Sequence, residues 1–531
     1  MNYRVGLPGL YLAARLVTAR PTRQLIHSVT FGTRMNRVFQ LCVAWLTLVS
    51  TVAIADDWPR FRGQAGSGVA SDSDSLPNAW SPDSNLAWKV QLPGPGASSP
   101  IIVGEKVLVT CYSGYGLDRK NPGEIEDLVR HLVCVDLTTG DTLWQKDIKA
   151  SLPEDPYDKS GVSSHGYASH TPCSDGTNVY CFFGKGGVYA FDLDGNNLWN
   201  AGAGKESDPP RWGSSSSPLV YKDTVIVTAS AESQSIIGFD KANGEKVWQQ
   251  EATGLDGMWG TPAIVRIDAR RTDLVMLVAK ELWGLDPENG KLRWHVKATS
   301  SAQAYASVIS HRARVFAFSG AGSVALDLGS SGDLDDSKAV WRGQVSATYA
   351  SPIRHKSKLY VVSRGILTVV DAESGKRLKQ MRLKDARITG NARFGSLDYA
   401  SPVVVGDRLF YLNASGQTYV FGLGDDVQQL AVNEVTTDRE VFWGSPAVSN
   451  GRMVLRSSKH LYCISDKSET VLPRESFVAN TDNANVQAAL TDVRRRGRGG
   501  RGSQAEYAKP ANDTRPDRPR RPTSVGAEQG N

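Results

Sequence analysis

The feature that most constrains this chain is a phrase of sequence that recurs eight times. Seven copies open on a small residue and a proline, the remaining copy has valine in the proline position, and each continues as a valine-rich strand. Most copies then end on an aspartate turn and a tryptophan. The opening positions are Pro100, Pro172, Pro218, Pro262, Val308, Pro352, Pro402 and Pro446. From Pro172 onward they lie 46, 44, 46, 44, 50 and 44 residues apart, which is the length of one four-stranded propeller blade. The repeat therefore predicts an all-β fold, an eight-bladed β-propeller of four-stranded antiparallel blades.

The turn between the last two strands of a copy carries its own motif. In the copy spanning residues 216–249, Asp240 opens the turn and Gly244 closes it, just ahead of Trp248. The aspartate can accept backbone N–H groups of the turn, and the glycine supplies a positive φ. We expect each tryptophan to pack between adjacent blades, where a large ring covers about 150–250 Å². Related turns stand at Asp136, Gly140 and Trp144, at Asp192, Gly195 and Trp199, at Asp286, Gly290 and Trp294, and, stretched, from Asp327 to Trp341; the sixth copy has Lys379 in the tryptophan position.

The last copy has no fourth strand of its own after residues 462–464. Residues 86–89 carry Trp88 at the right distance ahead of Pro100 to supply that outer strand. Such an overlap of the N-terminal and C-terminal parts would close the ring and leave no open sheet edge. A seven-bladed ring with one additional module is the competing count.

The N-terminal end differs from the repeats. Residues 1–55 contain six arginines and no acidic residue, and the apolar run 38–54 leads into Ala55. A basic flank, a short apolar core and small residues before the cleavage point predict a signal peptide that is cut near Ala55, and hence a secreted or periplasmic protein. Residues 1–34 could be an over-long start, with Met35 as the true one. An uncleaved membrane anchor is the alternative interpretation of the apolar run.

Three further regions follow. We expect residues 56–97 to form an N-terminal segment with the closing strand, residues 98–475 the propeller, and residues 476–531 a disordered basic tail. The chain carries +6 overall. The first 55 residues and the tail from Arg494 each carry +6, which leaves −6 for residues 56–493. The arginine-rich stretch 494–501 could contact an anionic polymer or simply keep the protein soluble. A secreted protein rarely meets nucleic acid, so we do not expect that partner.

Five cysteines follow Ala55. In an oxidising compartment Cys111 could pair with Cys134, and Cys173 with Cys181, because each pair lies on neighbouring predicted strands. The spacing permits these disulfides without requiring them, and Cys463 would be left over.

The repeat resembles the pyrroloquinoline-quinone-like repeat family. The turn phrase Asp-x-x-Thr/Asn-Gly-x-x-x-Trp is similar to that family's tryptophan-docking motif, and the resemblance spans roughly residues 58–465. Within the family the chain is most similar to the non-enzymatic branch typified by outer-membrane protein assembly factor B, an eight-bladed periplasmic scaffold. The resemblance therefore implies a propeller that binds partners in the cell envelope.

Long insertions and aromatic residues gather on one predicted face. In an up-and-down blade, the second-to-third loops and the blade-to-blade connectors share a face, here termed the connector face. The insertions 112–131, 147–168 and 383–397 fall on it, and binding often resides in long loops on a rigid scaffold. An aromatic residue stands three positions before five of the openings, at Trp259, Tyr305, Tyr349, Tyr399 and Trp443. Tyr167 holds a similar place if His170 and Thr171 are an insertion. These residues predict the rim of a funnel for a flat or chain-like ligand. The alternative is that each ring only packs against the neighbouring blade.

Polar residues near the rim are further candidates for the ligand site. His165 and His170 could bind a metal or act as a base, although hydrogen-bonded loop histidines are more common. Arg211 and Arg393 could receive a carboxylate or phosphate, or form ordinary ion pairs. Glu154, Asp155 and Asp158 offer hard oxygens for calcium, but they lack a spacing signature, so we expect a solvated acidic loop.

The sequence carries no common catalytic signature. It has no Cys-Cys pair of the kind usual in the family's alcohol dehydrogenases, no Cys-x-x-Cys-His haem site, no Gly-x-Ser-x-Gly elbow and no His-Glu-x-x-His motif. We therefore expect a monomeric, non-enzymatic scaffold without a cofactor, which binds a cell-envelope protein or an extended polymer. The alternative is a dehydrogenase of alcohols or sugars that uses pyrroloquinoline quinone and calcium.

Overall fold

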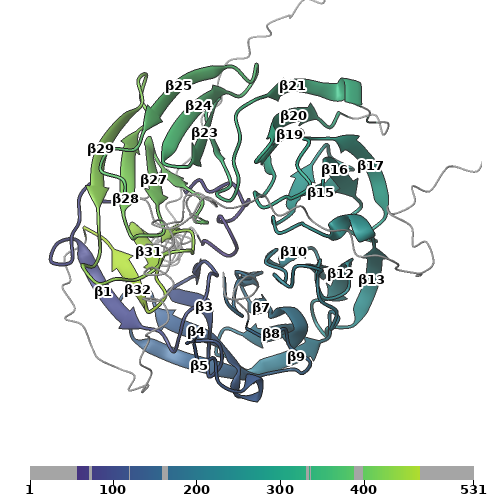
Figure 1. Cartoon of the computed structure of the whole chain (residues 1–531), viewed down its shortest axis with the longest axis vertical. Coiled ribbons are helices and arrows are strands. Elements are labelled where there is room, and N and C mark those ends of the chain that lie inside the picture. Colours follow the sequence, from purple (N-terminus) through teal and green to yellow (C-terminus); the bar gives the residue numbers. More distant parts are fainter. Residues whose placement is uncertain are drawn as a thin grey trace, which may run out of the picture. The chain divides into compact units, whose positions relative to one another are not determined.

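The computed structural model describes residues 57–70, 75–118, 120–157, 165–329, 334, 336–387 and 399–466. Within them, 32 strands form eight four-stranded antiparallel sheets, arranged around a central axis as the blades of a propeller (Figure 1). The eight-bladed prediction is confirmed, and the seven-bladed alternative is wrong. The predicted signal peptide, the basic tail, Asp158 and Arg393 lie outside the described residues. Among the described residues, no helix is long and apolar enough to cross a membrane.

The blades are numbered in chain order. Blade 1 comprises β2 (Ile101–Val103), β3 (Lys106–Ser113), β4 (Val129–Asp136) and β5 (Thr142–Lys149). Blade 2 comprises β6 (Cys173–Ser174), β7 (Asn178–Phe182), β8 (Val188–Asp192) and β9 (Asn197–Ala201). Blade 3 comprises β10 (Leu219–Tyr221), β11 (Thr224–Ala229), β12 (Ser235–Asp240) and β13 (Lys246–Glu251). Blade 4 comprises β14 (Ala263–Arg266), β15 (Thr272–Val278), β16 (Glu281–Leu285) and β17 (Leu292–Lys297).

The second half of the ring repeats this arrangement. Blade 5 comprises β18 (Ile309–His311), β19 (Arg314–Ser319), β20 (Gly322–Asp327) and β21 (Ala339–Gly343). Blade 6 comprises β22 (Ile353–His355), β23 (Lys358–Ser363), β24 (Ile366–Asp371) and β25 (Arg377–Arg382). Blade 7 comprises β26 (Val403–Val405), β27 (Arg408–Leu412), β28 (Thr418–Gly422) and β29 (Gln428–Asn433). Blade 8 comprises β30 (Ala447–Ser449), β31 (Arg452–Arg456), β32 (His460–Ile464) and β1 (Leu86–Gln91). Short 3-10 helices are η1 (Ile125–Asp127), η3 (Gly184–Gly186), η4 (Thr253–Leu255) and η5 (Asp336–Lys338).

Blade 8 confirms the predicted ring closure. Its strand order is β1-β32-β31-β30, so an N-terminal strand forms the outer edge of the last blade. Trp88 lies opposite Cys463 in this antiparallel pair. The closure leaves the ring without a gap between its first and last blades, which removes an open sheet edge.

Tryptophans on the outer strands join each blade to the next, as the turn motif predicted. The indole Nε1 of Trp88 donates to the carbonyl of Leu137 at 2.9 Å, the residue that follows the turn aspartate of blade 1. Gly140 has a φ of +79°, and a Cβ there would lie 2.7 Å from the Trp88 ring. The turn therefore requires glycine both for its backbone and for the close approach of the ring. The same contact recurs from Trp144 to Leu193, from Trp199 to Lys241 and from Trp341 to Ala372.

Other positions depart from this docking pattern. Trp248 packs against Gly290 of blade 4, but its indole Nε1 has no hydrogen-bond partner among the described residues. Blade 5 has the stretched turn, and Trp294, which faces it, donates instead to Asp273 at 2.8 Å within its own blade. Lys379 replaces tryptophan in blade 6, and its Nζ donates to the carbonyl of Val427 at 2.7 Å. The lysine thus makes the same kind of blade-to-blade hydrogen bond without the ring.

A closed ring of hydroxyl residues surrounds the central channel. One serine or threonine precedes each strand opening, and its backbone N–H donates to the hydroxyl of the corresponding residue in the next blade, at 2.8–3.1 Å. Eight such bonds return to their starting point, so the blades are tied at the centre as well as at the periphery. The residues of this hydroxyl ring are Ser99, Thr171, Ser217, Thr261, Ser307, Ser351, Ser401 and Ser445.

Replacing Ser351 by alanine should lower the free energy of unfolding by about 1–3 kcal/mol, because the buried N–H of Ser307 loses its acceptor. Urea unfolding measures this loss. Ser351→Thr is the matched control, since threonine already occupies the ring at two positions and keeps the hydroxyl. Equal stability of the alanine and threonine variants would contradict a role for this hydrogen bond.

The segment of residues 57–70, here termed the plug segment, crosses the central channel (Figure 1). Trp58 pairs with Ile102 of blade 1, and Val69 pairs with Val404 of blade 7 on their innermost strands. Between these points the carbonyl of Pro59 accepts the N–H of Ser174 in blade 2 at 2.8 Å. The sequence predicts only an N-terminal segment for these residues, whereas the structure places them inside the ring.

The proposed disulfides do not form. All five described cysteines are free and buried. On β3 and β4, Cys111 lies opposite His131 and Cys134 lies opposite Leu108, an offset of three residues that puts the two thiols on opposite faces of the sheet. Cys173 lies opposite Tyr180, so Cys181 points to the other face in the same way.

Candidate functional site

Six aromatic rings form a continuous series on the six connectors that run from blade 2 to blade 8. Their centroids are 5.4, 4.8, 5.0, 5.0 and 6.1 Å apart in order around the ring. Five were singled out in the sequence, and the structure adds a sixth, which contacts the first of them. We term this series the aromatic arc; it consists of Trp212, Trp259, Tyr305, Tyr349, Tyr399 and Trp443.

All six side chains of the aromatic arc are partly exposed. Each ring packs against the ring of the next blade and still presents part of its surface to solvent, so the packing is confirmed and the ligand site stays a prediction. Trp259 is further held by its indole, which donates to the carbonyl of Gly213 at 2.8 Å. Burial raises the pKa of Tyr349 and Tyr399, so both phenols are uncharged at neutral pH. The arc is therefore an uncharged surface fixed by its own packing.

Tyr167 does not belong to the arc. Thr171 occupies the hydroxyl ring directly, so the insertion assumed for residues 170 and 171 is absent and Ser169 holds the rim position. Tyr167 is buried instead and packs edge-on against Tyr112 at 5.4 Å. It belongs to the small core beneath the long loops of blade 1.

The acidic loop near residue 154 is buried, which corrects the expectation of a solvated loop. Both carboxylate oxygens of Glu154 accept from the guanidinium of Arg130, at 2.7 and 2.8 Å, and these two side chains are 2% and 3% exposed. Asp155 lies 3.0 Å from the ammonium of Lys185 and accepts from Ser207 at 2.5 Å. The loop is buried because each carboxylate has a cationic partner from another part of blades 1 and 2.

These pairs line a cavity that is open to solvent and is bordered by residues of blades 1, 2 and 3 and of their connectors. Trp212, the first residue of the aromatic arc, lines it as well. The side chain of His165 contacts Ser169, and its Nε2 lies 2.5 Å from the carbonyl of Trp212. Burial lowers the pKa of His165, although the Trp212 carbonyl opposes this. The cavity therefore adjoins one end of the arc, and His165 links the two.

A hydrogen-bonded row of three side chains lies within this cavity. Ser214 donates to Glu232 at 2.7 Å, so it accepts the Nε2 hydrogen of His170 at 3.0 Å. Burial lowers the pKa of His170 to about 3, with His165 and Arg130 contributing, so this histidine is neutral. Because His170 donates to the serine, it cannot take the serine's proton, and the row is not a nucleophile with its base.

Glu232 is the buried titratable group of this row. It is 3% exposed, and its Oε2 has no hydrogen-bond partner among the described residues. Burial raises the pKa of Glu232 from an ordinary 4.5 to about 7. The folded protein thus holds this proton more tightly than the unfolded chain does, and stability is lost as the pH rises from about 4.5 to about 7.

We predict that Glu232→Gln removes this pH dependence. Relative to the variant, the wild type should lose about 3 kcal/mol of unfolding free energy as the pH rises from about 4 to about 8, and show no further change above that range. Urea unfolding of both proteins across this range gives the difference between their unfolding free energies. The pH dependence of all other titratable groups is common to both proteins and cancels in this difference. Glu206→Gln, at an exposed site nearby, is the control. A wild-type-to-variant difference that stays constant with pH would contradict the assignment.

The remaining sequence candidates are dispersed. Arg211 is exposed in a left-handed turn, with a φ of +54°, and its N–H donates to the carbonyl of Asp208 at 2.9 Å. It lies beside Trp212 but outside the residues that line the cavity. Arg393 cannot be placed, since it falls outside the described part of the chain.

The residues of the acidic loop do not fit a calcium ion. Glu154 and Asp155 already bind Arg130 and Lys185, and calcium would need the same oxygens. Across the described ranges, no three His, Cys, Asp or Glu side chains converge as a metal site. We therefore derive no chemical step through calcium or a quinone here.

Sequence reasoning missed three parts of this region. The hydroxyl ring had a visible signal, since all eight residues before the openings are serine or threonine. The pairing of Arg130 with Glu154 and the row from His170 to Glu232 join side chains from different blades or loops. Neither has a fixed spacing that a motif could report.

Comparisons with known proteins support the same fold. The family model described as "Outer membrane protein assembly factor BamB" matches residues 129–381 and 333–475, more than half of the chain. The crystal structure of BamB from Moraxella catarrhalis aligns with a TM-score of 0.50 at 16% identity, covering 72% of this chain and 98% of that chain. Quinohemoprotein alcohol dehydrogenase from Comamonas testosteroni aligns with a TM-score of 0.54 at 12% identity, covering 84% and 86%. No curated protein matches the sequence.

At these identities the two structures establish the fold alone, whereas the family match rests on the sequence itself. The residues that the family model matches include most of the recurring docking turns. The eight four-stranded blades of the structure are the fold that such a repeat predicts. This chain belongs to the pyrroloquinoline-quinone-like repeat family of β-propellers.

Proposed function

We propose that this protein is a non-enzymatic binding scaffold of the cell envelope, and that its aromatic arc holds an extended polypeptide. The observation that carries the proposal is the uninterrupted series of six partly exposed rings on one side of a rigid ring of blades. Aromatic side chains offer large contact area at low entropic cost. Burial keeps Tyr349 and Tyr399 uncharged, which suits an apolar or mixed ligand.

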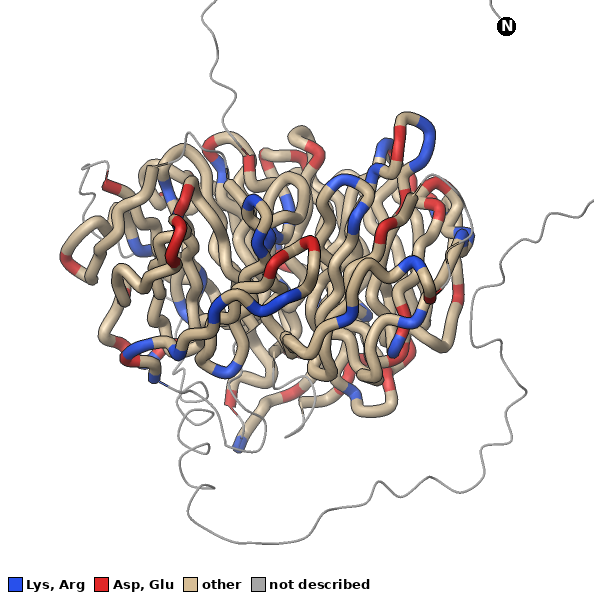
Figure 2. The backbone as a smooth tube through the Cα atoms, turned by 90° about the horizontal axis from the view of Figure 1, so that it is seen from above, with Lys and Arg blue, Asp and Glu red and all other residues tan. Residues whose placement is uncertain are grey.

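Figure 2 shows Lys and Arg positions interspersed with Asp and Glu positions along the described backbone in that view. The envelope location is supported by the family model, whose printed name is that of an outer membrane assembly factor. A polypeptide is favoured over a flat cofactor because the arc extends over six blades, and an extended chain can contact successive rings.

A peptide array probed with the purified full chain tests the proposal. The wild type should bind a subset of extended peptides, and Trp259→Ala combined with Trp443→Ala should abolish that binding without unfolding the ring. Leu378→Ala, at a residue that is 50% exposed on the outer edge of blade 6, should bind as the wild type does. Unchanged binding by the double variant would contradict the proposal, as would its unfolding.

The same protein can be titrated with a soluble polysaccharide and with pyrroloquinoline quinone plus calcium. Binding of the polysaccharide in place of peptides, with the same loss in the double variant, would keep the arc as the site and change the ligand. Saturable, calcium-dependent binding of the quinone would contradict the scaffold and support the dehydrogenase alternative.

A further inference from the structure

The plug segment carries two arginines into the central channel. Arg62 is 1% exposed, and one of its terminal nitrogens donates to the carbonyl of Pro352 at 2.6 Å and to that of Ser67 at 3.2 Å. Its Nε and its other terminal nitrogen have no partner among the described residues, and neither does the Nε of Arg60. Three buried donors of two cationic groups are therefore left over at one place.

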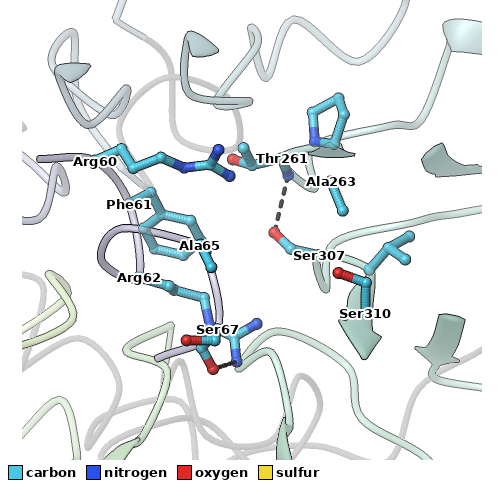
Figure 3. Close-up of a pocket in the computed structure, with 12 residues that line it drawn as sticks. Arg60, Phe61, Arg62, Ala65, Ser67, Thr261, Ala263, Ser307 and Ser310 are labelled. Carbon is cyan, nitrogen blue, oxygen red and sulfur yellow. Dashed lines mark hydrogen bonds between the residues drawn. The ribbon is translucent and has the colours of Figure 1, made fainter. Parts of the chain in front are cut away.

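These arginines line a small cavity that is partly open to solvent (Figure 3). On its other side stand Thr261, Ser307 and Ser310 from the openings of blades 4 and 5. Ser307 accepts the N–H of Thr261 within the hydroxyl ring at 2.9 Å, and a hydroxyl that accepts one hydrogen bond keeps its own hydrogen to donate. The cavity is thus bordered by donors on both sides, and none of the residues that line it is acidic.

The positive charges of Arg60 and Arg62 at this cavity are not matched by a negative charge among the residues that line it. Burial, with a smaller contribution from the nearby charge of Arg60, lowers the pKa of Arg62 to about 9. The buried ion pairs elsewhere in the described chain, such as Arg130 with Glu154, bring a carboxylate to each cation, whereas neither plug arginine has one among the described ion pairs. An uncompensated buried charge costs several kcal/mol, so a counter-anion would stabilise this arrangement.

We propose that the cavity binds one small doubly charged tetrahedral oxyanion, sulfate or phosphate, between Arg60, Arg62 and the hydroxyls of blades 4 and 5. A dianion matches the two guanidinium charges and accepts several hydrogen bonds at once. It would connect the plug segment to the two blades that face these arginines across the cavity. The site lies in the channel and is independent of the aromatic arc and of the proposed function.

Equilibrium dialysis of the full chain with radiolabelled sulfate and phosphate tests this directly, at constant ionic strength set with chloride. The wild type should bind one of these ions per chain with saturation. Arg62→Met and Arg60→Met should each weaken binding about tenfold or more, because each removes a charge-assisted hydrogen bond. Arg377→Met, at an exposed arginine outside the cavity, should bind as the wild type does.

Thermal melting in the same buffers provides the second readout. Sulfate should raise the melting temperature of the wild type more than that of either plug variant, since a ligand of the folded state stabilises it. An equal rise in all variants would reflect general salt exclusion and overturn the proposal, as would stoichiometric binding that survives both substitutions. Because Arg60→Met and Arg62→Met are tested separately, failure of one variant to fold leaves the other to decide. Tighter binding of acetate than of either dianion would also overturn the tetrahedral assignment.

Discussion

Replacing Trp88 by alanine is expected to lower the free energy of unfolding by about 3–5 kcal/mol, the range for truncating a buried aromatic side chain. Trp88 is 3% exposed, lies on the strand that closes the ring, and docks on the turn of blade 1 through its hydrogen bond to Leu137 and its contact with Gly140. One substitution thus weakens both the closing strand and its junction with the first blade.

Two controls separate these contributions. Trp341→Ala removes an equivalent docking contact inside the ring, at a residue that is 8% exposed, and should cost less because no chain closure depends on it. Trp88→Phe keeps an aromatic ring but loses the indole N–H and part of the buried ring surface, so it should cost less than Trp88→Ala. Chemical unfolding orders the three variants. A Trp88→Ala protein no less stable than Leu378→Ala would contradict the closure described above.

Glu154→Gln is the second substitution with a large expected effect. It removes the negative charge that faces Arg130 at a site where both side chains are nearly inaccessible to solvent. Breaking such a pair from one side costs about 3–5 kcal/mol, since the remaining charge stays buried without compensation. The loss should be seen as a lower midpoint of urea unfolding.

The matched control is the double variant Arg130→Met with Glu154→Met. Replacing both members of a buried pair by apolar residues of similar size is often nearly neutral, so the double variant should be more stable than Glu154→Gln. If the double variant were less stable than Glu154→Gln, Arg130 and Glu154 would not behave as an isolated buried charge pair. The result matters for the site because Arg130 and Glu154 line the cavity at the end of the aromatic arc.

The blades could be predicted from the sequence because the information for them is local. An opening such as Pro218 and a turn such as Asp240 to Gly244 each specify a short piece of backbone, and repetition turns these pieces into a count of blades. The closing strand followed from the same logic, since Trp88 repeats the docking residue at the right distance from Pro100. The aromatic arc was visible for the same reason, as one offset within the repeat.

The cavity and the plug segment could not be predicted in this way. Glu154 finds Arg130 across a loop, and Ser214 joins His170 to Glu232 between two blades, so their spacing carries no rule. The Cys111 and Cys134 pairing failed because neighbouring strands were known but their register was not, and a shift of one residue reverses the face of a side chain. Arg60 and Arg62 lie outside the repeat, and only the three-dimensional path of residues 57–70 brings them into the channel.

Site-specific photo-crosslinking in intact cells tests the central claim most directly. A photoreactive amino acid would replace Tyr349, in the middle of the aromatic arc, and in a second strain Leu378 on the outer edge of blade 6. If the arc binds an extended polypeptide in the envelope, the probe at position 349 should form discrete crosslinks to envelope proteins, and the probe at position 378 should form none of them. Crosslinks of equal pattern and yield from both positions would contradict the account, and so would their complete absence at position 349 in a folded protein.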